Sequence, residues 1–342
     1  MGLIQNPEER NALVTGGAGF IGSHAVDRLM QKGLEVTVVD NLSTGVLANI
    51  REHFGNRRFR LVTCDVRNAR RICEEVKRSD VILHLAGVVD VQRSLEDPVL
   101  VHDVNVLGTL NVLEACRKAD ADLLVYASSC AVYGNAGKVR VREDMTPKPL
   151  SPYAASKLAA ENYCLAFHKT YGLPVVCLRF FNVYGPRQRA GPYAGAVAKF
   201  VHRLLRNQPP IIYGNGKQSR DFVNFKDAVN ACLLSLQRRK AIGQTINIGS
   251  GRSTTVNDLA GLLVNLTHRT HMKPIYRPAR EGEVRHSLAD MSLAQKALGY
   301  KPTVSLKKGL LEYLEWTAIQ PQSRIDHRGR AKRRRQAQSL TS

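Results

Sequence analysis

The sequence predicts an α/β fold in which a doubly wound parallel sheet carries a smaller, mixed α/β C-terminal lobe. Strand and helix signals alternate through the first half of the chain, with strands beginning near residues 11, 35, 59, 80, 122 and 174. Long helices are expected at about 98–118 and 153–171. Strands that alternate with helices form parallel sheets, because each connection must cross back over one face of the sheet.

The later half of the chain is less regular. Clusters of proline and glycine at 185–195 and 208–216 mark expected substrate-binding loops. We therefore expect a first lobe at 1–180 and an interleaved substrate-binding lobe at 181–319, with a strand near 244–250 that returns to the first lobe. At 342 residues and 44% hydrophobic content, the chain can bury such a core.

A glycine loop follows the first predicted strand, at residues 11–15. Gly16, Gly19 and Gly22 recur at three-residue intervals, and helical periodicity begins at Phe20. Glycine is needed where the backbone turns sharply and approaches a pyrophosphate, while the helix N-terminus offers unpaired N–H groups to the anion. The loop predicts a dinucleotide site and a Rossmann-type sheet.

The second predicted strand, at residues 35–39, ends in Asp40. This carboxylate follows the glycine loop by about 20 residues, where it can accept hydrogen bonds from the ribose 2′-OH of an adenosine. It would repel a 2′-phosphate. The sequence therefore favours NAD over NADP as the cofactor.

Tyr153 and Lys157 stand one helical turn apart, so both lie on the same face of a predicted helix. A tyrosine titrates near pH 10, and a phenolate at neutral pH requires roughly 4 kcal/mol of preferential stabilisation. A lysine and a positively charged nicotinamide could supply it jointly. Ser129 follows the apolar strand at 122–126 and is expected at the carboxyl edge of the sheet. These three residues predict redox chemistry on an alcohol.

At these residues the sequence resembles the extended short-chain dehydrogenase/reductase family and, within it, the NAD-dependent nucleotide-sugar 4-epimerases. The resemblance runs almost continuously from Asn11 to about Tyr313. It includes VVDNLSTG at 38–45, CDVRN at 64–68, VNVLGTLNVLEAC at 104–116, RFFNVYGPRQ at 179–188, SRDFVNFKDAV at 219–229 and EGEVRHSLADMSLAQKALGY at 281–300.

The resemblance implies two sets of binding residues. Those expected at the cofactor, with Asp65 and Val66 at the adenine and Asn105 in support of the active site, are Gly16, Gly19, Phe20, Ile21, Gly22, Asp40, Asn41, Ser43, Thr44, Gly45, Asp65, Val66, Leu85, Ala86, Gly87, Asn105, Tyr153 and Lys157. Those expected at the UDP-sugar, with Asn182, Arg220, Arg280 and Glu283 at the nucleoside diphosphate, are Ser129, Asn182, Arg189, Arg220, Arg280, Glu283 and Ser287.

The residues after Ser129 separate the reactions of this family. Relatives that resemble 4,6-dehydratases carry an Asp-Glu pair there, and decarboxylases keep the glutamate, whereas this chain has Cys130 and Ala131. The missing acid and base argue against both reactions. What remains is oxidation and re-reduction at C4 of the sugar, through a transient 4-keto intermediate.

Ser287 bears on the choice of sugar. It falls where epimerases that resemble the hexose-specific ones place a bulky tyrosine, so we expect room for an N-acetyl group and activity on UDP-GlcNAc/UDP-GalNAc as well as UDP-Glc/UDP-Gal. The alternative is a UDP-glucuronate 4-epimerase, because Arg189 sits where those relatives use an arginine for the carboxylate. They usually carry threonine where this chain has Asn182, which weakens that alternative.

The net charge of +21 suggests a hypothesis of another class. Residues 324–335 (RIDHRGRAKRRR) are basic and poor in apolar residues, which predicts a disordered tail within 320–342. The chain could then be an NAD-binding scaffold whose tail contacts nucleic acid or an anionic membrane surface. Such a protein would be expected to lose its catalytic residues, and all three are present.

Seven cysteines and ten histidines show no spacing suited to a metal, and none is expected. Because no signal peptide and no stretch of 18 apolar residues is seen, we expect a cytoplasmic protein without a transmembrane segment. By resemblance, the two long helices are expected to pair with a second copy as a four-helix bundle, giving a homodimer.

Overall fold

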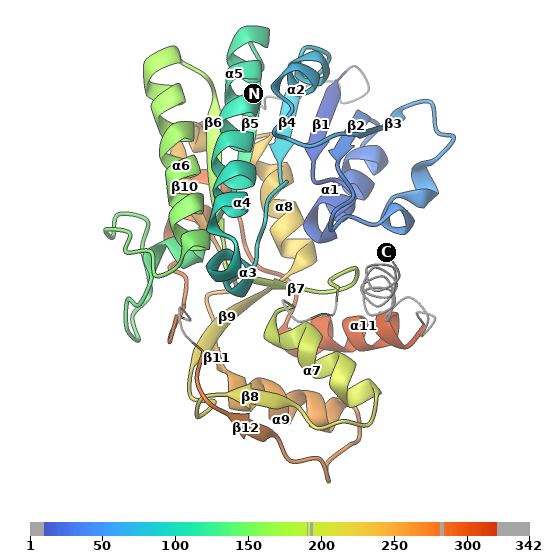
Figure 1. The fold of residues 1–342 in the computed structure, drawn as a ribbon, viewed down its shortest axis with the longest axis vertical. Helices are drawn as coiled ribbons and strands as arrows, with labels where there is room; N and C mark the ends of the chain where they lie inside the picture. The colour runs from blue at the N-terminus through green and yellow to red at the C-terminus, as the bar shows by residue number, and fades with distance from the viewer. Residues whose placement is uncertain (1–9, 190, 192–193, 281–283, 320–342) are drawn as a thin grey trace, which may run out of the picture.

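A computed structural model describes residues 10–189, 191, 194–280 and 284–319 (Figure 1). The predicted substrate residue Glu283 and the basic run at 324–335 lie outside the described residues.

The seven-stranded central sheet is parallel throughout and confirms the predicted Rossmann-type architecture. In spatial order its strands are β10 (Gln244–Ile248), β6 (Val175–Phe180), β5 (Leu123–Ser129), β4 (Val81–His84), β1 (Asn11–Thr15), β2 (Glu35–Asp40) and β3 (Phe59–Thr63). Strand β10 pairs with β6 at the edge, so a segment from the later half of the chain returns to the first lobe.

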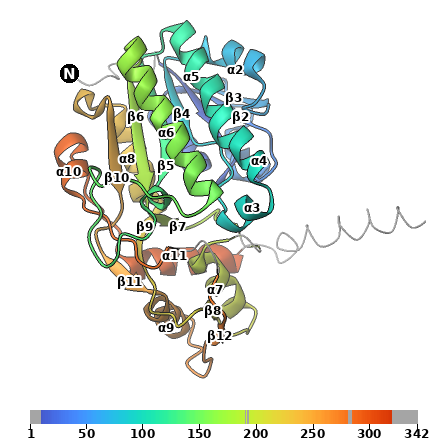
Figure 2. The ribbon, with the colours of Figure 1, turned by 60° about the vertical axis from the view of Figure 1, so that its left-hand side comes forward.

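Helices cover both faces of this sheet (Figures 1 and 2). One face carries α1 (Phe20–Gln31), α8 (Phe225–Ser235) and α10 (Ser292–Leu298), and the other carries α2 (Ala69–Val76), α5 (Gly108–Ala119) and α6 (Pro152–Tyr171). Successive strand residues point to opposite faces, so Val14 enters the first core and Leu13 the second, both fully buried. Because both faces of the sheet are covered, the strand sequences are continuous apolar runs.

The predicted helix at 98–118 is present and contains a π-helical turn. Helix α4 (Pro98–His102) passes into a π-helical turn, Asp103–Leu107, before α5 begins. The turn contains Asn105, whose side chain hydrogen-bonds the backbone of Val88 in the loop that follows β4. Such π-turns are common where a helix must aim one side chain at a site.

The whole span Pro98–Ala119 has the length and apolar composition of a membrane-crossing helix, but half of it is buried within the fold, as expected for a core helix.

The second lobe lies beyond the carboxyl ends of the sheet (Figure 1). It consists of a three-stranded mixed sheet, a two-stranded sheet and three helices: β7 (Asn182–Tyr184), β9 (Ser219–Asn224), β11 (Ser253–Thr255), β8 (Ile211–Tyr213), β12 (Ile275–Arg277), α7 (Ala196–Leu205), α9 (Val256–Leu266) and α11 (Leu306–Ile319). Phe200, Leu259, Leu263 and Tyr313 are buried between these helices as a separate core. Lys226, for which the sequence suggested no role, pairs with Glu312 at 2.7 Å and joins α8 to α11.

A buried histidine joins β1, β4 and α5 beneath the cleft. His84 Nδ1 lies 2.7 Å from Thr15 Oγ1, and Nε2 lies 3.0 Å from Thr109 Oγ1. The Thr109 hydroxyl donates to Asn105 O, so it accepts from Nε2–H, and Nδ1 accepts from the Thr15 hydroxyl. Complete burial of this neutral ring, with the charge of Lys157 nearby, lowers the pKa of His84 to about 3.

This histidine makes folding stability depend on pH. Between about pH 6.5 and pH 3 the unfolded chain binds a proton at His84 that the folded chain does not, so stability from this group falls by roughly 1.4 kcal/mol per pH unit as the pH drops. Urea unfolding of wild type and His84→Gln at pH 7, 6, 5 and 4 should show a shallower decline in the variant. The exposed His271→Gln serves as a control, and equal slopes in wild type and His84→Gln would contradict the assignment.

Candidate active site

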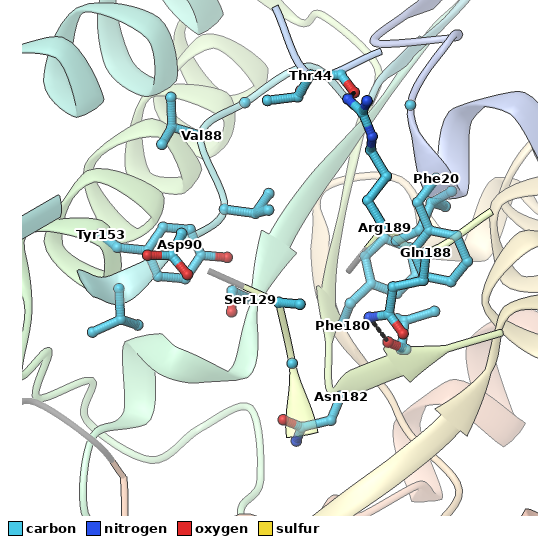
Figure 3. Close-up of a pocket in the computed structure, with 18 of the residues that line it drawn as sticks. Phe20, Thr44, Val88, Asp90, Ser129, Tyr153, Phe180, Asn182, Gln188 and Arg189 are labelled. Carbon is cyan, nitrogen blue, oxygen red and sulfur yellow. Dashed lines mark hydrogen bonds between the residues drawn. The ribbon is translucent and has the colours of Figure 1, made fainter. Parts of the chain in front are cut away.

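A cleft of about 1480 Å³ runs between the two lobes along the carboxyl edge of the sheet (Figure 3). The predicted site residues among the described ones line it, with two exceptions, Gly45 and Asn105, which lie behind its wall. The glycine loop, the catalytic candidates and the predicted sugar-side arginines therefore share one continuous space.

The glycine loop forms a tight turn at the N-terminus of α1. Gly16 has φ 70°, and a Cβ there would lie 2.7 Å from Ala86 N; a Cβ on Gly22 would collide with Gly16 O. Gly19 caps the helix without a side chain, so the N–H groups of the first turn face the cleft without a capping partner. The loop therefore fits the pyrophosphate of a dinucleotide.

Asp40 ends β2 beside this loop. Its Oδ2 accepts from Ala18 N at 3.0 Å and its Oδ1 from Leu42 N at 2.8 Å, which orients the carboxylate and leaves lone pairs for ribose hydroxyls. A Cβ on Gly45 would lie 2.6 Å from Asp40 Oδ1. Gly45 thus makes room for the carboxylate instead of lining the cleft.

Asp65, expected at the adenine, is held by two neighbours. Arg67 donates to both carboxylate oxygens at 2.9 Å, and Asn41 Nδ2 donates to Oδ2 at 2.8 Å. The bond from Arg67 lowers the pKa of Asp65 to about 2, so the carboxylate is ionised at neutral pH. Arg67 was not singled out from the sequence, although it lies within the CDVRN run.

Ser129 and Tyr153 line the same part of the cleft (Figure 3). Burial raises the pKa of Tyr153 to about 12, a hydrogen bond with Ser129 lowers it, and the charge of Asp90 raises it. The protein groups alone thus move this pKa away from the value that a base at neutral pH requires. The cationic nicotinamide of a bound cofactor would supply part of the missing stabilisation.

Lys157 lies on the cofactor side of this pair. Its Nζ donates to Ala127 O at 2.8 Å, and burial lowers the pKa of the ammonium to about 8. A Cβ on Gly87 would lie 3.3 Å from this Nζ and 3.0 Å from Asn105 Oδ1. The absent side chain at Gly87 keeps the ammonium open to the cofactor.

Asn105 does not line the cleft, but its side chain holds the backbone near Tyr153 in place through hydrogen bonds. Its Oδ1 accepts from Val88 N at 2.8 Å, and its Nδ2 donates to Val88 O and to Ser156 Oγ, both at 2.9 Å. Ser156 in turn donates to Tyr153 O at 2.8 Å. One buried amide therefore ties the loop after β4 to the first turn of α6, which carries the tyrosine.

The sugar-side residues come from the second lobe. Asn182 Nδ2 lies 3.4 Å from Ser287 Oγ, and the Arg280 guanidinium stacks 3.6 Å from the centre of the Tyr213 ring. Ser287 is 7% exposed and lines the cleft, so it is not a surface serine. Its segment is anchored by fully buried Asp221, which accepts from the backbone N–H of Ala289.

Arg189 takes a direction that the sequence did not indicate. Its Nη1 donates to Thr44 O at 2.9 Å, so its guanidinium extends to the cofactor loop and away from Ser129 (Figure 3). The preceding Arg187 lies 2.7 Å from Asp27 Oδ2 on α1. The segment that carries both arginines thus crosses from the second lobe to the first, over the cofactor side of the cleft.

Several charged residues of the cleft were not among the predicted site residues, and Asp90 and Lys199 are two of them. Asp90 precedes α3 (Val91–Glu96), in the loop that follows β4, and its place at the carboxyl edge of a parallel sheet was a usable signal. Lys199 lies on α7 in the second lobe. It had no sequence signal, because only the packing of the two lobes brings it to the cleft.

The glycine loop, Asp40 and the Ser129–Tyr153–Lys157 set define an enzyme of the dinucleotide-dependent dehydrogenase/reductase type. The family model described as "NAD dependent epimerase/dehydratase family" matches residues 12–249. The chain belongs to this family and to the extended short-chain dehydrogenases/reductases, it uses NAD, and it is an isomerase of the nucleotide-sugar epimerase type.

The similar proteins are named for UDP-sugar substrates, and they differ both in the reaction and in the sugar. The chain is 41% identical over 309 residues to a putative UDP-glucose 4-epimerase of Methanocaldococcus jannaschii, covering 89% of this chain and 97% of the relative. It is 32% identical to a UDP-N-acetyl-alpha-D-glucosaminuronate decarboxylase of Bacillus cytotoxicus, covering 90% and 98%.

Solved structures superpose over nearly the whole chain. A Thermotoga maritima UDP-glucose 4-epimerase with UDP-glucose has a TM-score of 0.85 at 38% identity, covering 90% of this chain and 98% of that one. A Methanobrevibacter ruminantium UDP-N-acetylglucosamine 4-epimerase in complex with UDP-N-acetylmuramic acid has a TM-score of 0.86 at 35% identity, covering 91% and 99%.

Proposed function

We propose that this chain epimerises a UDP-sugar at C4 through a transient 4-keto intermediate, and that it accepts UDP-GlcNAc/UDP-GalNAc as well as UDP-Glc/UDP-Gal. The observation that carries the proposal is the position of Ser287, a small side chain in the wall of the same cleft as Ser129 and Tyr153. A small residue there leaves volume for the acetamido group of an N-acetylhexosamine.

The catalytic step follows from the geometry. The Tyr153 phenolate would take the proton of the sugar 4-OH, and the Ser129 hydroxyl, which lines the same part of the cleft, would share it. NAD, when bound, supplies the hydride acceptor and donor at C4. Lys157, held through Ala127 O, would bind the cofactor and place its charge beside the reacting groups. Rotation of the 4-keto sugar in the wide cleft would let the proton and hydride return on the other face.

The residues after Ser129 support epimerisation over dehydration or decarboxylation. Cys130 and Ala131 stand where those reactions need carboxylates. Burial raises the pKa of the Cys130 thiol to about 12, so it cannot replace a base at neutral pH.

The UDP-glucuronate alternative relied on Arg189 for the uronic acid. Because this guanidinium bonds Thr44 O on the cofactor side, its direction favours a role at the cofactor loop over one at the sugar. This supports the choice of a neutral sugar.

The test incubates the purified protein with UDP-glucose, UDP-GlcNAc and UDP-glucuronate separately, without added reductant, and reads the C4 configuration of the products by proton NMR. Conversion of UDP-GlcNAc would support the proposal. Conversion of glucuronate alone would reassign the substrate. Absence of conversion of all three, with NAD supplied, would favour other nucleotide sugars or the scaffold hypothesis.

Ser287→Tyr should lower kcat/KM for UDP-GlcNAc by roughly ten- to two-hundredfold and leave UDP-glucose within a few-fold, because a bulky ring would fill the acetamido space. Steady-state rates on both substrates provide the measurement. Ser292→Tyr, at an exposed position near the same segment, is the matched control. An equal loss on both sugars, with normal melting temperature, would refute the gating role.

We also propose a homodimer. Helices α4 to α6 leave large apolar side chains exposed on one side of the molecule, among them Val99, Leu107, Tyr163 and Tyr171. A second copy packed as a four-helix bundle would bury them, and sedimentation equilibrium would show twice the chain mass.

All seven cysteines are free, Cys164 and Cys177 among them, which supports the proposed cytoplasmic location.

A further inference from the structure

We propose that Asp90 is a specificity-determining residue for the sugar. Its carboxylate accepts a hydrogen bond from a hydroxyl or amide N–H of an uncharged sugar and repels a uronic acid. The inference rests on the proposed function and goes beyond it, because it assigns the exclusion of uronates to one side chain.

The carboxylate is fixed by the backbone of its own helix. Asp90 is the N-cap of α3, and its Oδ1 accepts from Arg93 N at 2.7 Å. The residue is half-buried and lines the cleft with Ser129 and Tyr153 (Figure 3). One oxygen is thus engaged in capping, while the group as a whole stays at the reacting end of the cleft.

The charged groups around Asp90 come from both lobes. Burial raises the pKa of Asp90, and the charges of Lys199 on α7 and Arg280 in the second lobe lower it. These two cations also line the cleft. Asp90 is therefore an acidic group of the first lobe close enough to two cations of the second lobe to feel their charge, in a cleft that all three residues line.

Helix capping by itself does not require a charged side chain at position 90. The charge of Asp90 raises the pKa of Tyr153 and so opposes formation of the catalytic phenolate. Asparagine caps helices about as well as aspartate and carries no charge. A fixed anion at this position can accept hydrogen bonds from sugar hydroxyls and from an acetamido N–H.

A uronic acid would present the opposite chemistry. Its carboxylate would enter a cleft that already holds a half-buried anion, and like charges brought together at a desolvated site oppose binding strongly. Asp90 therefore acts as the repulsive element that separates neutral UDP-sugars from UDP-uronates.

The test uses Asp90→Asn, which keeps the cap and removes the charge. Calorimetric titration of the NAD-loaded full chain with UDP-GlcNAc and with UDP-glucuronate should show the affinity ratio shifting toward glucuronate by at least about tenfold. The pH at which kcat/KM on UDP-GlcNAc reaches half its alkaline value should also fall, because the phenol loses an unfavourable neighbour. Asp97→Asn is the matched control: Asp97 caps α4 through Leu100 N at 3.0 Å and does not line the cleft.

An unchanged affinity ratio in Asp90→Asn, or the same shift in Asp97→Asn, would overturn the inference. The binding ratio is independent of turnover. If wild type failed to epimerise any of the three sugars while Asp90→Asn still shifted the ratio, the proposed reaction would fail and the role of Asp90 would stand.

Discussion

Tyr153→Phe is expected to lower kcat on UDP-sugars by roughly a thousandfold while NAD stays bound, since a positioned acid–base group contributes about 10²–10⁴ to the rate. Tyr153 is 8% exposed, and it lines the cleft together with Ser129. Phenylalanine keeps the packing of the ring and removes only the oxygen that exchanges the proton of the sugar 4-OH.

The measurement pairs turnover with cofactor content. Product ratios by NMR give kcat, and NAD released from denatured protein gives occupancy. Tyr163→Phe is the matched control, because Tyr163 lies on the same helix but is 42% exposed. A Tyr153→Phe rate equal to wild type would remove the tyrosine from its assigned role, and loss of NAD from the variant would show that the phenol oxygen serves chiefly to bind the cofactor.

Glu161→Gln is expected to destabilise the protein by about 3–5 kcal/mol, because it leaves a buried arginine without its counter-charge. Arg179 Nη2 lies 2.5 Å from Glu161 Oε1, and the two side chains are 5% and 1% exposed. Ser128 Oγ donates to Glu161 Oε2 at 2.6 Å, so the pair also supports the strand residue next to Ser129. Turnover should therefore fall together with stability.

Urea unfolding at pH 7 measures the change in free energy of unfolding. Glu114→Gln breaks an exposed pair with Arg117 at 2.9 Å and should cost no more than about 1 kcal/mol. If Glu161→Gln does not fold, a double variant that replaces Glu161 and Arg179 with methionine should recover much of the stability, because no unpaired charge remains. A single-variant loss as small as that of Glu114→Gln would contradict this account.

Much of the fold could be predicted because its signals are local. The alternation of strands and helices, the spacing of Gly16, Gly19 and Gly22, and the one-turn separation of Tyr153 from Lys157 are all properties of short segments. The π-turn at Asn105 was not predictable in this way. The Asn105 side chain on this turn bonds Val88, which lies in a loop outside the helix, and no local helical pattern indicates such a bond.

The surroundings of Tyr153 affect its acidity in ways that the sequence did not indicate. From the sequence, Tyr153 required a lowered pKa, and a lysine four residues away was a source of charge. Burial and the neighbouring Asp90 instead raise the pKa of the phenol. Burial and long-range charge depend on which segments pack around a residue, and no local pattern reports them.

The sequence by itself determined the sheet, the glycine loop and the set of candidate catalytic residues, since each is encoded by residues that are neighbours in the chain. Only the tertiary structure decided where the charges of the cleft lie: Asp90 from the first lobe, Lys199 from the second, and Arg189 turned toward Thr44. The physical reason is that these side chains come from segments about a hundred residues apart. Their distances are set by how the two lobes pack, so their chemistry appears only once the chain is folded.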